Sequence, residues 1–151
     1  MTPPLVIGFT GTREGMTAAQ LAAVRALLVA AADRPLEVHH GDCLGADAEF
    51  DALAREVTPA AERHIHPPTD IAKAAACWIG GGCVLYPPFP YLQRDRHIVD
   101  ACRVLIATPR GVKEELRSGT WMTVRYARAK GKARRIVWPD GTVTHDPTPT
   151  R

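Results

Sequence analysis

Residues 105–123 read LIATPRGVKEELRSGTWMT, and this stretch decides the fold. Its aliphatic start is typical of a buried strand, which stops at Pro109. A polar loop follows, and Ser118-Gly119-Thr120 then opens a segment of helical character. Backbone N–H groups at a helix N-terminus lack intrahelical acceptors, and the helix dipole favours negative charge there. The stretch therefore predicts a strand that leads into a phosphate-sized cradle at the start of a helix.

Two earlier loops have the same design. The loops at 10–15 and 41–45 carry glycines, and each connects a short apolar run to a helix-like segment. At the start of the first helix, Thr17 and Gln20 fit a capping box. Strands that alternate with helices through short glycine-bearing loops are typical of βαβ units. The chain is therefore expected to form an α/β fold with a mostly parallel sheet of about five strands.

The remaining elements follow from apolar periodicity and turn residues. Strands are expected at 5–9, 36–40, 62–66, 103–108 and 133–138, with a short edge strand at 142–143, and helices at 17–32, 46–56, 91–101 and 120–130. Segment 69–90 is less regular: a short helix is expected at 71–78, before a run of glycines and a proline-rich stretch. This segment is either a flap over a ligand or a plain connecting loop.

Length and composition indicate a single domain at 1–144 and a frayed, Thr/Pro-rich tail at 145–151. The chain has 151 residues, of which 46% are hydrophobic and 23% charged, which is typical of a globular protein. No apolar run approaches the roughly 20 residues that span a bilayer, and the N-terminus lacks signal-peptide features. We therefore expect a cytoplasmic protein without a membrane partner.

The cysteines predict neither disulfides nor a metal site. Cys43, Cys77, Cys83 and Cys102 include no Cys-x-x-Cys pair, and no His-x-x-x-His accompanies them. Without an export signal, reduced thiols are expected. The chain also has no Gly-x-Gly-x-x-Gly and no Walker Gly-Lys-Ser/Thr sequence. We therefore expect no metal and no resident cofactor.

Positive charge is concentrated toward the C-terminus. Residues 1–93 carry six Lys/Arg and ten Asp/Glu, whereas residues 94–151 carry thirteen Lys/Arg and six Asp/Glu. Such a surplus attracts a polyanion or a phosphorylated small molecule, but it is also ordinary for a solvated helix. Charge alone leaves both interpretations open.

The three loops are expected to meet at one edge of the sheet. In an open parallel sheet, ligands bind outside the carboxyl ends of the strands, near the point where the strand order reverses. Glycines let the backbone approach a phosphate, hydroxyls add hydrogen bonds, and arginines fork onto phosphate oxygens. The candidate nucleotide- and phosphate-binding residues are Thr10, Gly11, Thr12, Arg13, Gly41, Asp42, Gly45, Asp47, Arg94, Ser118, Gly119 and Thr120.

The acidic residues of these loops also have plainer interpretations. Asp42 and Asp47 are expected to hydrogen-bond the loop backbone or cap the second helix, which is favoured over metal binding. As a ligand contact, Asp47 would bind a ribose hydroxyl. Asp95, which follows Arg94, is expected to form an ion pair that orients the arginine.

Four blocks resemble the signature blocks of the SLOG superfamily. They are FTGTR at 9–13, HGDCLGAD at 40–47, FPYLQRDRHI at 89–98 and SGTWMTVRYA at 118–127. The resemblance extends from residue 5 to 141 and implies a Rossmann-like three-layer fold and a homodimer. The superfamily includes cytokinin-activating LOG phosphoribohydrolases, the DNA-processing protein A that loads recombinase onto single strands, and small stand-alone sensors of nucleotide ligands.

The LOG branch implies hydrolysis of the N-glycosidic bond of a nucleoside monophosphate. Arg94 falls at the position of the arginine of that family, whereas Thr123 stands where the family has a glutamate. Leu-Arg at 116–117 replaces the paired glycines of the family. Without the carboxylate the reaction lacks its acid–base group, unless a glutamate at 114 or 115 supplies it.

The DNA-processing branch implies binding of single-stranded DNA. Sequence blocks of that branch are similar to residues 89–98 and 118–127 of this chain. The basic C-terminal part is compatible with binding of nucleic acid. Proteins that bind bare single strands stack the bases on exposed aromatic rings. The candidate rings are Tyr86, Phe89, Tyr91 and Trp121, and packing explains them equally well.

The loops and the resemblance together predict a binding protein rather than an enzyme. The expected ligand is a nucleotide or a nucleotide-derived small molecule at the C-terminal edge of the sheet, in a homodimeric sensor or effector. The alternatives are single-stranded DNA binding and phosphoribohydrolase (nucleotide N-glycosidase) activity, in which Arg94 would be catalytic.

Overall fold

One sheet of seven strands organises the chain in the computed structural model, which describes residues 2–146. The strand order is β4-β3-β2-β1-β5-β6-β7, and every neighbouring pair is parallel except β6 and β7. The strands are β1 (Leu5–Gly11), β2 (Leu36–His40), β3 (Glu62–Ile65), β4 (Cys83–Leu85), β5 (Val104–Thr108), β6 (Ala133–Val137) and β7 (Val143–Asp146). The helices are α1 (Ala18–Ala31), α2 (Ala46–Val57), α3 (Tyr91–Ala101) and α4 (Gly119–Ala129), with a 3₁₀ helix η1 (Ile71–Lys73).

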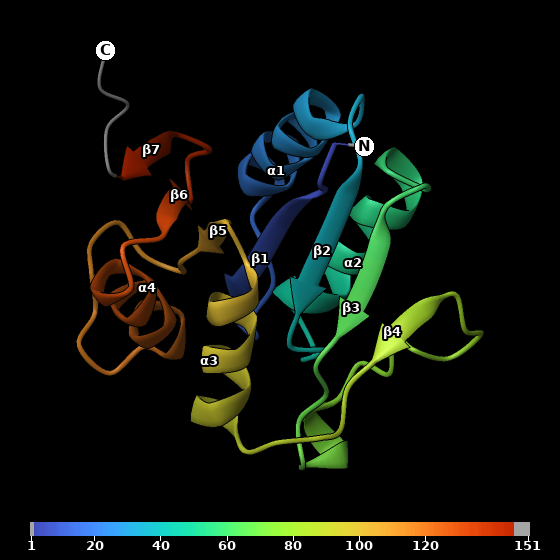
Figure 1. Ribbon diagram of the computed structural model, residues 1–151. Helices are drawn as coiled ribbons and strands as arrows, with labels where there is room; N and C mark the ends of the chain where they lie inside the picture. The colour runs from blue at the N-terminus through green and yellow to red at the C-terminus, as the bar shows by residue number, and fades with distance from the viewer. Residues whose placement is uncertain (1, 147–151) are drawn as a thin grey trace.

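Helices cover both faces of the sheet, so the fold has three layers (Figure 1). On one face, α1 and α2 contact each other, and the rings of Phe9 in β1 and Phe50 in α2 stack with their centroids 4.3 Å apart. On the other face, α3 contacts α4, and Leu105 of β5 packs with Trp121 and Val124 of α4. The predicted α/β architecture with a mostly parallel sheet is confirmed.

The strand order reverses between β1 and β5. The chain adds β2, β3 and β4 on one side of β1 and then returns to add β5, β6 and β7 on the other side. At such a reversal the connections leave the sheet in opposite directions, which opens a crevice outside the carboxyl ends of the two central strands. The first and third predicted loops follow β1 and β5, so they flank this crevice.

The number of strands was underestimated, because the structure has seven rather than about five. The additional strand β4 has only three residues and lies between a glycine run and a proline-rich stretch. It is too short to show the alternation of apolar and polar residues that predicts a strand. It pairs with β3 at the sheet edge. The helix expected at 71–78 is wrong beyond its first turn, since only η1 forms there.

The C-terminal boundary also differs from the prediction. Strand β7 extends past residue 144 to Asp146, whose Oδ2 atom lies 2.8 Å from the Arg134 guanidinium of β6. This ion pair and the antiparallel ladder hold residues that were assigned to a frayed tail. The rest of the predicted tail, 147–151, lies outside the described residues. No helix within 2–146 has both the length and the apolar character needed to cross a bilayer.

Gln20 links the start of α1 to the sheet edge that carries the crevice. Its side chain accepts from the Thr17 backbone, which completes the capping box, and donates to the carbonyls of Pro109 (2.8 Å) and Val137 (2.9 Å). Gln20 is buried, so replacement by alanine leaves these groups without partners. Gln20→Ala is expected to lower the free energy of unfolding by about 2 kcal/mol in urea titrations.

The matched control for this variant is Gln93→Ala, which makes the same substitution at an exposed position of α3. It should change the free energy of unfolding by less than about 0.5 kcal/mol. Equal effects of the two substitutions would contradict the linking role of Gln20.

Candidate functional site

A cavity of about 290 Å³ lies at the C-terminal ends of β1, β2 and β5. It is bounded by the loops that follow β1 and β2, by α3, and by the N-terminus of α4. The lining residues are Phe9, Thr10, Gly11, Thr12, Arg13, Gly41, Cys43, Asp47, Tyr91, Arg94, Asp95, Arg110, Arg117, Ser118, Gly119 and Thr120. Ten of the twelve candidate residues from the sequence are among them; Asp42 and Gly45 are not.

The N-terminus of α4 faces this cavity. The hydroxyl of Ser118, the N-cap residue, accepts a hydrogen bond from the Trp121 backbone N–H (3.3 Å). The N–H groups of Gly119 and Thr120 belong to the first turn, where no intrahelical acceptor exists. A Cβ atom on Gly119 would lie 1.4 Å from the Tyr91 hydroxyl oxygen, so only glycine permits this close approach of α3. The result is a set of backbone donors with a positive helix end, suited to an anion.

Arg94 places a buried positive charge beside these donors. Its side chain is 3% exposed, and its Nε atom has no hydrogen-bond partner within residues 2–146. The nearest carboxylate contact of Nε is Asp95 Oδ1 at 3.7 Å, and the guanidinium carbon lies 5.4 Å from the centroid of the Tyr91 ring. A Cβ atom on Gly41 would lie 3.0 Å from Nε, so this glycine leaves the space that the guanidinium occupies. A buried, incompletely paired guanidinium is costly unless an anion binds it.

Two carboxyl groups lie near Arg94, and burial weakens the negative charge of both. Burial raises the pKa of Asp95 to about 7, although the Arg94 charge and a hydrogen bond from the Thr123 hydroxyl (3.1 Å) act in the opposite direction. Burial also raises the pKa of Asp47, whose Oδ2 atom accepts a hydrogen bond from the Cys43 backbone N–H (3.1 Å). The cavity is therefore more positive than a count of its ionisable residues indicates.

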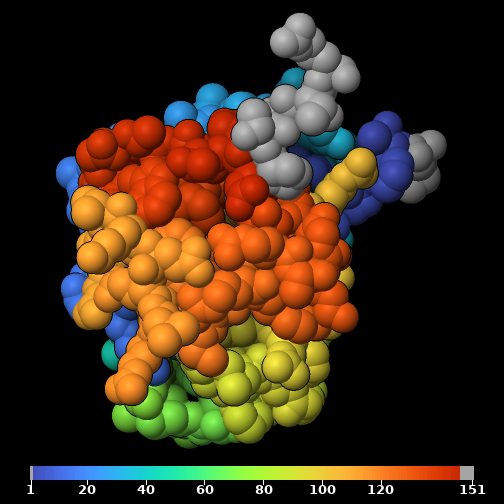
Figure 2. All heavy atoms as spheres, turned by 90° about the vertical axis from the view of Figure 1, so that its left-hand side faces the viewer, coloured from blue at the N-terminus to red at the C-terminus, as the bar shows by residue number. Residues whose placement is uncertain are grey.

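Three further arginines surround the cavity at its surface. Arg13, Arg110 and Arg117 are exposed. Arg110 forms ion pairs with Glu115 (2.9 Å) and Glu14 (3.4 Å), so it connects the loop after β5 to the loop after β1. Figure 2 shows the segment between β5 and α4, in gold, on the surface beside α4. These side chains are placed to approach a ligand from the solvent side.

The two candidate residues outside the cavity position its walls. Asp42 has a positive φ of 55°, and its Oδ1 atom accepts a hydrogen bond from the Cys77 backbone (2.8 Å), so its side chain ties segment 69–90 to the end of β2. Gly45, the N-cap residue of α2, has φ 92°, and a Cβ atom there would lie 2.2 Å from the Arg13 carbonyl oxygen. Gly45 thus lets the loops after β1 and β2 touch each other.

The sequence interpretation missed Tyr91 and Asp95 as lining residues. Both lie on α3, and Tyr91 is three residues before Arg94 and four before Asp95, the spacings that place side chains on the same helix face. This helical spacing was the signal that could have identified them. Arg110 and Arg117 belong to an irregular loop, so no period in the sequence marks them.

The candidate stacking rings are mostly engaged in packing. Trp121 is 3% exposed and lies 5.7 Å from the Trp138 ring between centroids, and Phe89 packs edge-on against His97 at 4.8 Å. The Tyr86 ring stacks on His66 with centroids 4.1 Å apart. Tyr91 is the candidate ring that lines the cavity. Of the four candidate rings, one is therefore placed to contact a ligand in the cavity, and the four do not form a row of stacking platforms.

Comparison with solved structures identifies several chains of the same architecture. The molybdenum cofactor binding protein of Rippkaea orientalis has a TM-score of 0.68 at 16% identity, over 91% of this chain and 78% of that chain. DNA processing protein A of Streptococcus pneumoniae has a TM-score of 0.67 at 17% identity, over 88% of this chain and 50% of that chain. The molybdenum cofactor carrier protein of Chlamydomonas reinhardtii has a TM-score of 0.62 at 18% identity, over 89% and 76%. The fold is therefore Rossmann-like, as in these three proteins.

This likeness confirms the fold that the four sequence blocks predicted. At 16–18% identity, the similarity shows the fold alone. The chain spans half the length of DNA processing protein A of Streptococcus pneumoniae. No family model matches the sequence, and no curated protein matches it either.

Proposed function

We propose that the chain binds a nucleotide or a nucleotide-derived small molecule in the arginine-lined cavity and acts as a sensor or effector, not as a hydrolase. The phosphate would accept hydrogen bonds from the first turn of α4 and from Arg94. The ribose would lie toward Asp47 and Asp95, whose carboxyl groups can hydrogen-bond hydroxyls. We further propose that the protein works as a cytoplasmic homodimer.

The observation that carries this proposal is the incomplete pairing of the buried Arg94. A guanidinium that is 3% exposed, with its Nε atom unbonded to any residue in 2–146, is unfavourable in the free protein. It lies in the wall of the same cavity that receives the N-terminus of α4. The guanidinium and the N-terminus of α4 are two independent sources of positive potential in the same cavity, which supports an anionic ligand.

The dimensions of the cavity support a single nucleotide. Small-molecule sites usually enclose about 300–1,000 Å³, and the cavity of about 290 Å³ is at the lower end. A dinucleotide would extend well beyond it. The structural neighbours support a small-molecule or nucleic-acid ligand in general terms, since two of those named above bind or carry molybdenum cofactor.

Thr123 makes hydrolysis a less favoured function of the cavity than ligand binding. This residue, at the position of the family glutamate, donates its hydroxyl to Asp95 and also lies 3.1 Å from the Gly119 carbonyl. A threonine hydroxyl cannot exchange a proton at neutral pH as a carboxylate does. The glutamates of the β5–α4 loop bind arginines: Glu114 contacts Arg125 and Arg128, and Glu115 contacts Arg110.

Binding of single-stranded DNA is weakened by the same ion pairs. Four arginines of the C-terminal part already form ion pairs within the chain, since Arg110, Arg125, Arg128 and Arg134 each lie within 4.0 Å of a carboxylate oxygen. A strand of DNA would have to compete with these contacts. Because the fold is similar to that of DNA processing protein A, an oligonucleotide is included among the ligands tested below.

A thermal-shift screen tests the proposed function. The panel contains nucleoside monophosphates, the matching nucleosides, ribose 5-phosphate and an oligothymidylate. We expect at least one monophosphate to raise the melting temperature in a concentration-dependent way, since a ligand that binds only the folded state stabilises it. Its nucleoside should not, and chromatography of the mixture should reveal no free base. Stabilisation by the oligonucleotide alone would favour the DNA-binding alternative instead.

Ligand affinity is expected to rise as the pH falls from 8 to 6.5. The pKa of Asp95 is raised to about 7 by burial, so its carboxyl group loses its charge over this range and ceases to repel a phosphate. A phosphate monoester has its second pKa near 6, so it stays largely dianionic above pH 6.5. We expect a gain of up to about tenfold, the effect of removing one nearby like charge near a protein surface.

Asp95→Asn is the control for this pH effect. Its neutral amide keeps the shape of the side chain, so affinity should vary little between pH 8 and 6.5. Titration calorimetry at several pH values measures both proteins. A pH dependence that persists unchanged in Asp95→Asn would assign the effect to another group.

A further inference from the structure

A second cluster of polar residues lies on the sheet itself, outside the cavity. The tripeptide Glu-x-His occurs at 37–39 in β2 and again at 62–64 in β3. The parallel register places Glu37 opposite Glu62 and His39 opposite His64. Residues two apart in a strand point to the same face, so the repeat forms a grid of two carboxylates and two imidazoles.

The grid faces away from α2. His40, which follows His39, and Arg63, which lies between Glu62 and His64, point to the other face, where both contact Asp51 of α2 at 2.8 Å. In Figure 1, α2 lies behind β2 and β3, so the grid is on the near face, to the right of α3. Among its members, the Glu62 side chain is 62% exposed and that of Glu37 22%. A small ion can therefore reach the grid from solvent through the carboxylates.

The donor atoms of the grid converge. The Oε1 atom of Glu37 lies 3.0 Å from Nε2 of His39 and 3.0 Å from Nε2 of His64. The Oε1 atom of Glu62 lies 2.6 Å from the same Nε2 atom of His64. Ligand atoms about 2.0–2.1 Å from a tetrahedral zinc ion are about 3.3 Å apart, so these separations are close to those of a coordinated set.

Each imidazole is also held from its other side. Nδ1 of His39 lies 2.8 Å from Nε2 of His66, and Nδ1 of His64 lies 2.7 Å from the Tyr86 hydroxyl. Metal-binding histidines usually donate their second ring N–H to an acceptor, which fixes the ring and directs the other nitrogen at the ion. His66 and Tyr86 both offer acceptor atoms for this purpose.

We propose that Glu37, His39 and His64, with Glu62 at the open side, bind a divalent transition-metal ion of the zinc type. Imidazole ligands select such ions over magnesium and calcium, which prefer oxygen donors. Two like-charged carboxylates opposite each other destabilise a sheet, and a divalent cation removes that repulsion. The two rings stack with centroids 4.2 Å apart at 20°, so an ion shared by both requires them to splay apart.

A second cluster of possible ligands, His40, Asp51 and Cys77, is less suited to an ion. The Arg63 guanidinium lies 2.8 Å from Asp51 Oδ1, so a positive charge already occupies that carboxylate. In addition, His40 Nδ1 accepts a hydrogen bond from the Asp42 backbone N–H, so the proton of the neutral ring must lie on Nε2, which faces Asp51. The grid and this cluster lie on opposite faces of β2, and variants can distinguish them.

Titration of the metal-free full chain with Co²⁺ tests the proposal. Co²⁺ takes the place of zinc and gives a visible absorption that reports tetrahedral coordination by nitrogen and oxygen. We expect one equivalent to bind with micromolar or tighter affinity and excess Zn²⁺ to displace it. His64→Gln and Glu37→Gln should abolish the absorption, and Tyr86→Phe, which removes an outer hydrogen bond, should weaken binding about tenfold.

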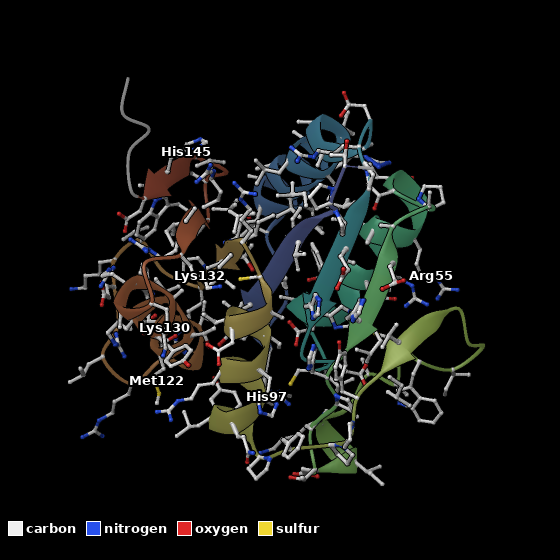
Figure 3. The ribbon with its side chains drawn as sticks, viewed as in Figure 1. Arg55, His97, Met122, Lys130, Lys132 and His145 are labelled. Carbon is white, nitrogen blue, oxygen red and sulfur yellow. The ribbon has the colours of Figure 1, made fainter. Side chains whose placement is uncertain are left out.

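Two controls identify the site. His145→Gln makes the same change on β7, which Figure 3 places on the opposite side of the molecule from β2 and β3, and Cys77→Ser removes a thiol of the alternative cluster. Neither should alter Co²⁺ binding. The wild-type titration needs no variant to fold, so failure of the wild-type chain to bind Co²⁺ or Zn²⁺ at micromolar concentration overturns the proposal. Binding that survives in His64→Gln, or is lost in Cys77→Ser, overturns it as well.

Discussion

Replacement of Arg94 by methionine is expected to abolish ligand binding while leaving the free protein at least as stable as the wild type. The first effect follows because the buried guanidinium lines the same cavity as the first turn of α4 and is shielded from solvent. Removing one partner of a buried, hydrogen-bonded charge pair costs about 2–5 kcal/mol, which corresponds to a loss of affinity of roughly thirtyfold or more.

The expected effect of Arg94→Met on the stability of the free protein is opposite in sign to that of an ordinary core substitution, which destabilises the fold. The Nε atom of Arg94 has no hydrogen-bond partner within 2–146, so the free protein carries the desolvation cost of the charge without full compensation. Methionine fills similar volume without charge, and such replacements are often neutral or stabilising by about 1–4 kcal/mol. Urea denaturation of the free variant measures this change, and thermal shift with the bound monophosphate measures affinity.

Arg96→Met is the matched control for Arg94. Arg96 lies on the same helix, is exposed, and contacts the Tyr126 ring at 5.3 Å, so its loss should leave binding within about twofold of wild type. If Arg94→Met strongly destabilises the free protein instead, Arg94 is a structural residue. The central assignment of the cavity would then be wrong.

Gly45→Ala is expected to have the largest effect on stability among single changes at the site. Its φ of 92° is costly for any residue with a Cβ atom, and that atom would lie 2.2 Å from the Arg13 backbone carbonyl. A backbone group cannot move aside as a side chain does, so the loops after β1 and β2 must separate. We expect a loss of about 3–5 kcal/mol in the free energy of unfolding, from strain and overpacking together.

Gly131→Ala is the control for a glycine of positive φ without the loop contact. Gly131 also has a positive φ, 69°, but a Cβ atom there would have no neighbour within 4 Å. This control should cost about 1 kcal/mol, the strain alone, with ligand affinity unchanged. In Gly45→Ala, affinity should fall as well, because Arg13 and Gly41 line the cavity from the two loops that are forced apart. Equal losses of stability in the two variants would rule out the loop contact as the cause.

Elements with strong local signals were predictable from the sequence. The bounds of α3 agree with the predicted helix at 91–101, and the capping box of Thr17 and Gln20 is present as expected. Both are set by residues close together in the chain, where periodicity and caps act directly. The three loops also meet at one cavity, because parallel strands place their carboxyl ends at one sheet edge.

Features that depend on distant neighbours were not predictable. Strand β4 exists because β3 offers a free edge, not because three residues prefer to be extended. The roles of Asp42 and Gly45 depend on which segment packs over their loop, and nothing local specifies that Cys77 or Arg13 lies there. The Glu-x-His repeat is visible in the sequence, but its significance requires the register of β2 and β3.

Titration calorimetry of the wild-type chain with paired ligands tests the central claim most directly. Each nucleoside monophosphate is compared with its own nucleoside at pH 7, and the best pair is repeated with Arg94→Met. The cavity as described predicts one binding site per chain for at least one monophosphate, binding at least about a hundredfold weaker for its nucleoside, and no binding to the variant. Equal affinity for nucleoside and monophosphate, or unchanged affinity in Arg94→Met, would contradict the assignment of the cavity as a phosphate site.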